Sequence, residues 1–460
     1  MENEKEKNLT LPHQSNVENE KKKNNNKYPT LPHELIIEIL LRLPVRSVLR
    51  FRRVCKSWSS LISDPHFAKS HFDFNAAPTH RLLLRFINEN RARVQSFDLA
   101  SSLGDRSAVK TLNFPSPPMS CDHNPLHFLG SCRGFMLLAY ERTGDVIVWN
   151  PTTGFHKQIL DIDHEFMFSY LCGFGYDNST DDYFVVVITL YLPKTEIRVF
   201  SLKTKSWCDI KYVNVRYMDC GYNSGPGHPG VFLNGSLHWQ VTRMDTGLDV
   251  VIAFDLVKNS LSDIPLSSEL AAEWTEKVYY LRELGGYLSM CYAGGSRRRE
   301  RAEIWVMKEY KVQSSWTKAF VTTVCDIPRR RFYPICFIEG GGVVGSNGHG
   351  RLLKFNAKGK LLEHLKYDRE YENGQKYFEM YRESLLFFPG EQRLLCVTED
   401  EESEDAEEEE TIDEDTSEYE YSISEEEYST EDEDATEDEE TTKDEYATEG
   451  EKTTDDEEEN

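Results

Sequence analysis

One sequence feature limits the possible folds of residues 80–398 more than any other. A short alternating apolar run, closed by a large apolar side chain, recurs at a nearly constant distance along the chain. The closing residues are Phe97, Trp149, Phe200, Phe254, Met307 and Phe355. They are separated by steps of 52, 51, 54, 53 and 48 residues. A period of this length indicates a repeat architecture in which each unit packs against the next.

Each period contains about four strand-length runs, bounded by Gly, Asn, Asp and Pro. Gly134–Tyr140 and Tyr183–Thr189, for example, each precede one of the closing runs. Four short strands in about 50 residues are typical of a kelch-type propeller blade. We therefore predict an all-β, propeller-like body of about six four-stranded repeats over residues 80–398. The repeats lack the regular Gly-Gly pair of true kelch blades, so a twisted β-sandwich is the alternative. The segment 296–310 reads as an insertion that makes the fifth repeat the least regular.

Residues 29–73 have a different, helical pattern. Pro32 suits the first position of a helix, and apolar residues then recur on one face until Pro44 ends it. A second helix is expected over 45–54, a short third one over 56–62, and Asp64-Pro65 marks a further start. We predict a small all-α bundle built on a helical hairpin. About 42 residues without a disulfide or metal site bury little surface alone, so the bundle is expected to need a partner surface.

The helical segment resembles the F-box. The resemblance rests on Leu31-Pro32-x-Glu34-Leu35-x-x-Glu38-Ile39-Leu40-x-Arg42-Leu43-Pro44, then Leu49, Phe51, Val54-Cys55-Lys56-x-Trp58, Leu61-Ile62 and Asp64-Pro65-x-Phe67. The β body is similar to the F-box-associated domain of the plant F-box/kelch-repeat-like families. This second resemblance rests on Gly130-Ser-Cys-Arg-Gly134, Val148-Trp-Asn-Pro-Thr152, Gly173-Phe-Gly-Tyr-Asp177 and Asn234-Gly-Ser-Leu-His-Trp239.

By resemblance, the chain is expected to be the substrate-receptor subunit of an SCF-type cullin-RING ubiquitin ligase. The F-box would dock a Skp-type adaptor, and through it a cullin and a RING protein, while the β body binds the protein to be ubiquitinated. The alternative is an adaptor-bound scaffold that captures a ligand without ubiquitinating it. The apolar anchors expected to enter a groove of the adaptor are Leu31, Pro32, Leu35, Ile39, Leu40, Leu43, Pro44, Leu49, Val54 and Trp58. The competing interpretation makes them core residues of the bundle.

The loops of the repeats are the expected site of substrate binding, because propellers vary in their loops while the strands hold the frame. Cys220–Gly230 and Ser296–Arg301 are the candidate loops. The substrate itself is not identified by the sequence.

No motif in the sequence favours an enzyme. Gly340-Gly-Gly-Val-Val-Gly345 matches a dinucleotide fingerprint in form, but another strand pattern follows it where a phosphate site needs a helix. The histidines are scattered, and the ten cysteines show no zinc-ligand spacing. We expect a non-catalytic protein without cofactor or metal.

Charge divides the chain into a mildly basic body and an acidic end. Residues 399–460 hold 35 Asp/Glu and 2 Lys, a balance of −33, so a total of −26 leaves +7 for the other 398 residues. A body charge of +7 is weak for nucleic-acid binding. Residues 1–28 and 399–460 have too few apolar residues to form a core, and we expect a disordered arm and a disordered acidic tail. Neither a secretion signal nor a membrane-length apolar run is seen, which favours the cytoplasm, the nucleus or both.

Overall fold

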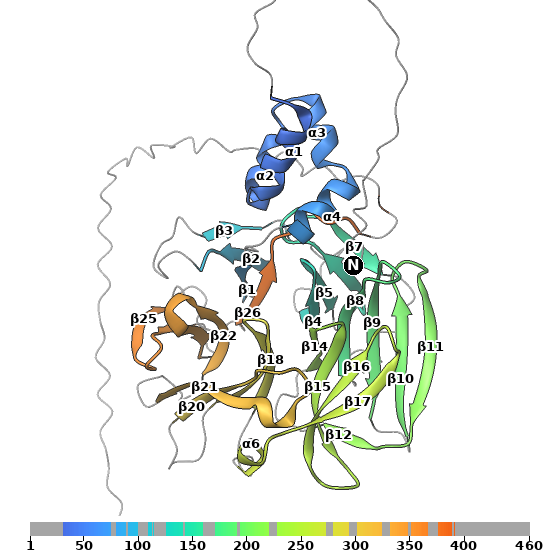
Figure 1. Ribbon diagram of the computed structural model, residues 1–460, viewed down its shortest axis with the longest axis vertical. Helices are drawn as coiled ribbons and strands as arrows, with labels where there is room; N and C mark the ends of the chain where they lie inside the picture. The colour runs from blue at the N-terminus through green and yellow to red at the C-terminus, as the bar shows by residue number, and fades with distance from the viewer. Residues whose placement is uncertain are drawn as a thin grey trace, which may run out of the picture. The chain divides into compact units, whose positions relative to one another are not determined.

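A computed structural model describes most of residues 31–391 (Figure 1). The described residues are 31–74, 80–88, 91–99, 109–112, 114, 126–140, 143–159, 171–190, 194–219, 228–272, 279–293, 301–323, 332–347, 351–366, 376–388 and 391. The predicted arm and the predicted acidic tail lie outside them. No helix among these residues has the length and apolar character needed to cross a bilayer.

Four helices form the N-terminal unit. They are α1 (His33–Arg42), α2 (Val45–Phe51), α3 (Lys56–Ile62) and α4 (Pro65–Phe74). Pro32 precedes α1 in an extended conformation, with φ −53° and ψ 143°, and its carbonyl accepts the amides of Leu35 and Ile36. The prediction that Pro32 is the first helical residue was therefore wrong by one position. The second helix also ends before residue 54, because Arg53 and Val54 bond to carbonyls only three residues back.

Six antiparallel sheets follow, which confirms the six-repeat prediction and excludes the sandwich. The first sheet contains β26 (Lys376–Arg382), β1 (His80–Asn88), β2 (Arg91–Phe97) and β3 (Val109–Thr111). The second contains β4 (Leu126–Cys132), β5 (Phe135–Tyr140), β6 (Val146–Trp149) and β7 (His156–Ile159). The third contains β8 (Leu171–Asp177), β9 (Asp182–Thr189), β10 (Thr195–Ser201) and β11 (Ser206–Val213), with β13 (His228–Pro229) parallel to β8.

The last three sheets repeat this arrangement. In the fourth, β12 (Tyr217–Asp219) and β14 (Val231–Leu233) both pair with β15 (Ser236–Arg243), followed by β16 (Asp249–Asp255) and β17 (Ser260–Pro265). The fifth contains β18 (Tyr279–Leu284), β19 (Tyr287–Ala293), β20 (Arg301–Met307) and β21 (Trp316–Thr323). The sixth contains β22 (Tyr333–Ile338), β23 (Gly342–Ser346), β24 (Arg351–Phe355) and β25 (Leu361–Lys366). A short helix, α6 (Ser268–Ala272), follows β17.

The recurring sequence signature is the third strand of every blade. Its six closing residues are the last residue of β2, β6, β20 and β24 and the last but one of β10 and β16, and each is at most 2% exposed. Met307 occupies this position as the aromatic residues do. The expected insertion at 296–310 was wrong for its second half, because Arg301–Met307 is strand β20 and pairs with both β19 and β21.

The ring of blades is closed by the last strand of the body. β26 pairs antiparallel with β1, from His80 opposite Arg382 to Phe86 opposite Lys376. The first blade therefore takes one strand from the C-terminal side and three from the N-terminal side. This joint stabilises a propeller because the hydrogen bonds between β26 and β1 tie the two ends of the body together within one blade.

Candidate adaptor-docking and substrate-binding surfaces

Helix α1 carries apolar side chains on two faces. Ile36, Leu40 and Leu43 pack into the core of the helical unit, where Leu40 is completely buried. Leu35 and Ile39 are one turn apart on another face and are 45% and 48% exposed, and Leu31, two residues before the helix begins, is 56% exposed. We call these three residues the outer stripe. A second apolar face with no covering is typical of a surface that binds a partner.

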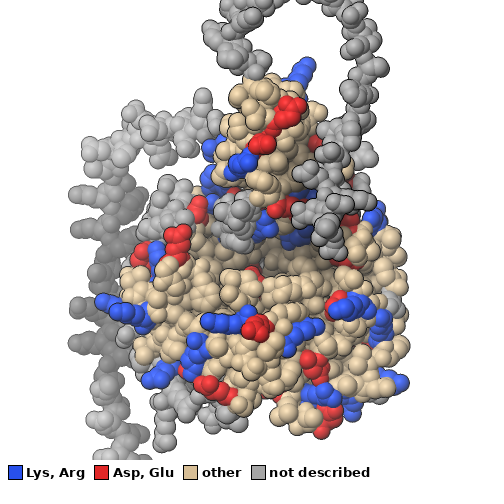
Figure 2. Space-filling view, in the orientation of Figure 1, with Lys and Arg blue, Asp and Glu red and all other residues tan. Residues whose placement is uncertain are grey.

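The other predicted docking residues are distributed between surface and core. Val54 is 61% exposed, and Pro32 and Pro44 are also on the surface. Leu43, Leu49 and Trp58 are half-buried against the core of the helices. Leu40 is 0% exposed, so the prediction that it is a docking anchor does not fit its position, and the competing interpretation as a core residue does. On the side visible in Figure 2, large uncharged areas of the helical unit reach the surface.

An extended segment, Glu383–Phe388, joins the helices to the propeller, and we call it the strap. Its side chains alternate: Leu385 and Phe387 pack with the helical core, whereas Leu386 and Phe388 pack with the core between the second and third blades. Leu385 is 0% exposed and Phe388 is 4% exposed. Because side chains of an extended chain alternate between two sides, this one short segment packs against two cores.

A buried ionic group lies at the start of the strap. The carboxylate of Glu383, whose residue is 3% exposed, accepts a hydrogen bond from Nε of Arg46 in α2 and lies 3.7 Å from Nε of Arg81 in β1. Arg81 also donates to Ser96 Oγ at 2.6 Å, and Ser96 bonds the Tyr381 hydroxyl at 2.8 Å. Although burial opposes it, the hydrogen bond and charge of Glu383 raise the pKa of Arg46.

Two of the motifs recognised in the sequence build this junction. Asn150 is 0% exposed, accepts the amide of Thr152 in a tight turn, and donates Nδ2 to the carbonyl of Ser384 at 3.1 Å. Gly134 has φ +88°, and a Cβ placed there would lie 2.3 Å from the Ser384 Cβ. Glycine is therefore required where the strap crosses this turn.

Arg133 connects α4, the last of the four N-terminal helices, to the propeller. Its guanidinium lies over the rings of Phe72 in α4 and Tyr176, at 4.5 Å and 4.2 Å from the ring centres. Asp73 lies 3.9 Å from Arg133, and Lys69 forms a second ion pair with Asp181 at 3.3 Å. These contacts seat α4 on the turns that join the first and second strands of the second and third blades.

The contacts with the helices distinguish the two edges of the propeller. The helical unit covers the edge with tight turns, such as those at 132–135 and 177–182. The connections after the second and fourth strands start and end at the opposite edge. Both candidate substrate loops start and end there as well: one connects β12 to β13, where His228 pairs with Leu171 at the start of β8, and the other connects β19 to β20. Residues 220–227 and 296–300 themselves lie outside the described residues.

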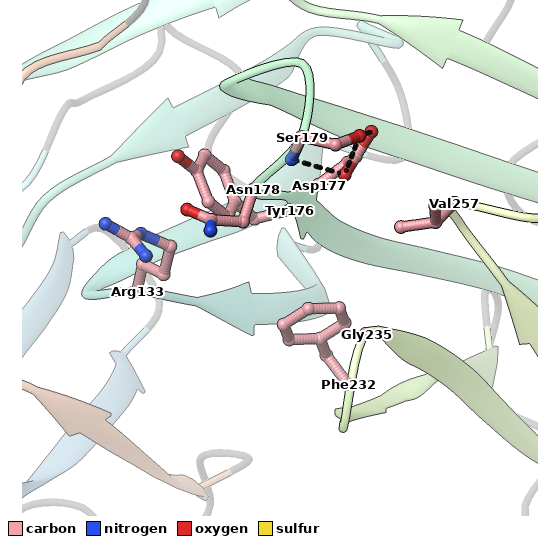
Figure 3. Close-up of a pocket in the computed structure, with 8 residues that line it drawn as sticks. All are labelled: Arg133, Tyr176, Asp177, Asn178, Ser179, Phe232, Gly235 and Val257. Atoms are coloured by element: carbon pink, nitrogen blue, oxygen red, sulfur yellow. Dashed lines mark hydrogen bonds between the residues drawn. The ribbon is translucent and has the colours of Figure 1, made fainter. Parts of the chain in front are cut away.

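A pocket of about 460 Å³ opens on the edge that carries the helices (Figure 3). It is lined by Arg133, Tyr176, Asp177, Asn178, Ser179, Phe232, Gly235 and Val257. Arg133 and Val257 lie on opposite sides of it, and the Phe232 ring forms part of its wall. The sequence did not identify this pocket, because its residues come from turns of three different blades.

The polar groups of the pocket are mostly engaged within the turns that carry them. Asp177 accepts hydrogen bonds from Ser179 and Thr180, which lower its pKa although burial raises it. The Tyr176 hydroxyl donates to Asp181, and burial followed by this bond raises the pKa of the tyrosine. Ser179 Oγ donates to both carboxylate oxygens of Asp177 at 2.8 Å, so the hydroxyl and the carboxylate are held together within one turn.

Metal ligation also has no site in the described ranges. No group of three or more His, Cys, Asp or Glu side chains there is placed to hold a metal ion. Cys132, Cys172 and Cys291 are buried, and burial raises the pKa of Cys172 to about 12, so its thiol stays protonated at neutral pH.

A helical F-box followed by a six-bladed β-propeller defines an F-box protein of the substrate-receptor type. Residues 29–70 match the F-box domain, and residues 85–355 match the F-box associated beta propeller domain. The chain belongs to the F-box associated beta propeller family.

Curated relatives come from Arabidopsis thaliana. An F-box/kelch-repeat protein is 29% identical over 300 residues, which cover 63% of this chain and 78% of the relative. F-box protein CPR1 is 30% identical over 325 residues, which cover 63% of this chain and 72% of CPR1. Among solved structures, TolB from Acinetobacter baumannii aligns over 68% of this chain and 71% of its own at 11% identity, with a TM-score of 0.35.

Proposed function

We propose that this protein is the substrate receptor of an SCF-type cullin-RING ubiquitin ligase, acting in the cytoplasm, the nucleus or both. The F-box binds a Skp-type adaptor, which brings a cullin and a RING protein. The propeller binds the substrate with the edge opposite the helices. In this role the chain needs no catalytic group of its own, because a receptor contributes proximity and orientation.

The proposal rests on the exposure of the outer stripe. Leu31 just before α1 and Leu35 and Ile39 within it are all exposed, while the other face of that helix already fills the core. An amphipathic helix of this kind fits a hydrophobic groove of a partner. The strap and the ion pairs of Glu383 with Arg46 and Arg81 then hold the propeller in a fixed orientation on the F-box, and thereby relative to the adaptor.

Co-purification with a Skp-type adaptor tests the docking surface. We expect Leu35→Ala/Ile39→Ala to weaken adaptor binding strongly, because apolar hot spots cost about 2 kcal/mol or more each when truncated. Leu362→Ala is the matched control, since Leu362 is 53% exposed but belongs to β25. Unchanged adaptor binding by the double variant, with an unchanged melting temperature, would refute docking through the outer stripe.

Substrate capture tests the opposite edge. We expect replacement of 221–227 or 296–300 by Gly-Ser linkers of equal length to change the set of captured partners without changing the melting temperature. A captured partner is then offered to the reconstituted ligase. Ubiquitination of that partner supports the receptor role, whereas binding without ubiquitin transfer favours a scaffold.

A further inference from the structure

Four cationic side chains meet where α2 lies against the first blade. Arg46 and Arg50 are one helical turn apart on α2. Arg46 Nη2 lies 3.5 Å from Ser96 Oγ, and Arg81 Nε donates to the same oxygen at 2.6 Å. Ser96 stands directly opposite Lys110 in the pairing of β2 with β3. Because directly opposed residues of an antiparallel pair share a face of the sheet, Lys110 lies on the side that meets Arg46. We call Arg46, Arg50, Arg81 and Lys110 the junction cations.

The anions at this junction do not balance the junction cations. Glu383 forms ion pairs with both Arg46 and Arg81, and Asp98 lies 3.2 Å from Arg81. Within the described part of the chain, neither the guanidinium of Arg50 nor the ammonium of Lys110 has an ion-pair or hydrogen-bond partner. Among the described groups, the side-chain charges of Arg50 and Lys110 are therefore not compensated by a carboxylate. The neighbouring sequence is also basic, since residues 51–63 add Arg52, Arg53 and Lys56 and contain no Asp or Glu.

The crowding of cations affects Lys110 itself. Burial and the charges of Arg46, Arg50 and Arg81 lower the pKa of Lys110, and the charge of Glu383 only partly opposes them. Like charges held together by two separate elements of the fold repel each other and weaken the joint between them. A bound anion removes this repulsion, because it offers both elements a common partner.

We propose that Arg50, Lys110 and the accessible edge of Arg46 form a binding site for an oxyanion with at least two negative charges, such as a phosphate group of a phosphorylated small molecule or of a phosphorylated side chain. Helix α2 supplies two guanidinium groups that donate in pairs to phosphate oxygens, and β3 supplies one ammonium group. The bound oxyanion bridges the F-box and the first blade. Occupation of the site therefore tightens the seating of the F-box on the propeller. The inference does not depend on the proposed ligase function.

Calorimetric titration of the full-length protein with tripolyphosphate at low ionic strength tests the site, with sodium chloride at equal ionic strength as the blank. We expect saturable binding and a higher melting temperature with tripolyphosphate only. Arg50→Gln and Lys110→Gln should each weaken binding about tenfold, because each variant loses a charge-assisted hydrogen bond to the oxyanion. Arg53→Gln is the matched control, since it removes the same charge from the same segment but is not among the charges that lower the pKa of Lys110.

The outcomes separate the alternatives. A short phosphoserine peptide that binds as well as tripolyphosphate identifies a phosphoprotein as the source of the oxyanion, and weaker binding of the peptide identifies a free polyphosphate-type ligand. Both results support the site. Equal affinity of the wild type, Arg50→Gln and Lys110→Gln overturns the proposal, as does the absence of saturable binding. Without ligand, the two variants should melt no lower than the wild type, since each removes a like charge from the cluster.

Discussion

At the scale of single residues, the junction between the F-box and the propeller depends on one carboxylate. Glu383 is 3% exposed and lies between two guanidinium groups that come from different elements. When one partner of a buried ion pair is removed, the remaining charge stays in a poorly solvated place. The loss then exceeds the net contribution of the intact group.

We predict that Glu383→Ala lowers the free energy of unfolding by about 3–5 kcal/mol, because Arg46 loses its counter-ion and Arg81 keeps Asp98 but loses its buried one. Urea unfolding of the two proteins measures this. Glu38→Ala is the control: it breaks the exposed pair of Glu38 with Arg42, and we expect a change of at most about 0.5 kcal/mol. Similar small losses for both variants would contradict the importance of the junction.

A buried histidine makes stability depend on pH. His238 is 0% exposed, and its two ring nitrogens contact the Val231 carbonyl at 2.9 Å and the Tyr310 hydroxyl at 2.7 Å. Burial lowers the pKa of His238 to about 4, against an ordinary value of 6.5. Between these two values the unfolded chain binds a proton that the folded chain does not, so stability falls as the pH falls.

We predict that the folded protein loses about 2 kcal/mol from His238 between pH 7 and pH 5, since each pH unit below the unfolded pKa contributes about 1.4 kcal/mol. Urea unfolding at the two pH values, for wild type and His238→Gln, measures the difference. The variant should show a smaller loss, to which His71 still contributes because burial lowers its pKa as well. An equal loss in both proteins would exclude His238 as a source of the pH dependence.

At the scale of elements, the strap makes the F-box part of the folded body rather than a separate module. Its alternation assigns each side chain to one core, so neighbouring substitutions are expected to act on different parts of the molecule. Such local differences appear in hydrogen exchange, which reports the opening of individual units.

We predict that Leu385→Ala raises amide exchange in α1–α4, whereas Leu386→Ala raises it in β5, β8 and β9. Each substitution should cost about 2–5 kcal/mol, since both side chains are buried. Hydrogen exchange with peptide-level resolution distinguishes the two patterns. Identical exchange patterns in both variants would show that the strap does not divide its contacts.

At the scale of the whole molecule, stability depends on closure of the ring. The first blade is complete only when β26 pairs with β1, across nearly 300 residues of sequence. The two ends of the body must therefore meet before the ring is closed.

We predict that a chain ending at residue 375 does not unfold cooperatively, because it lacks β26 and the strap. A chain ending at residue 398 should keep the melting temperature of the full protein, although its net charge changes from −26 to +7. Calorimetry of the two truncated chains provides the test. A cooperative transition in the shorter chain would contradict the role of the joint.

Local patterns of the sequence determined the helices of the F-box, the number of blades and the position of the third strand in each. The physical reason is that burial of an apolar face imposes a period that can be read without knowing its partners. The two faces of α1 also follow from this pattern, but which face is covered does not: the docking prediction included Leu40 because the outer stripe and the core residues of this helix are equally apolar. Tertiary structure alone decided that Leu40 is core, that 301–307 is a strand and that Leu385 and Leu386 belong to different cores. It alone brought Glu383 to Arg46 and Lys110 close to Arg50. These contacts join residues separated by 60 to over 300 positions, and their choice depends on ring closure, which no local period encodes.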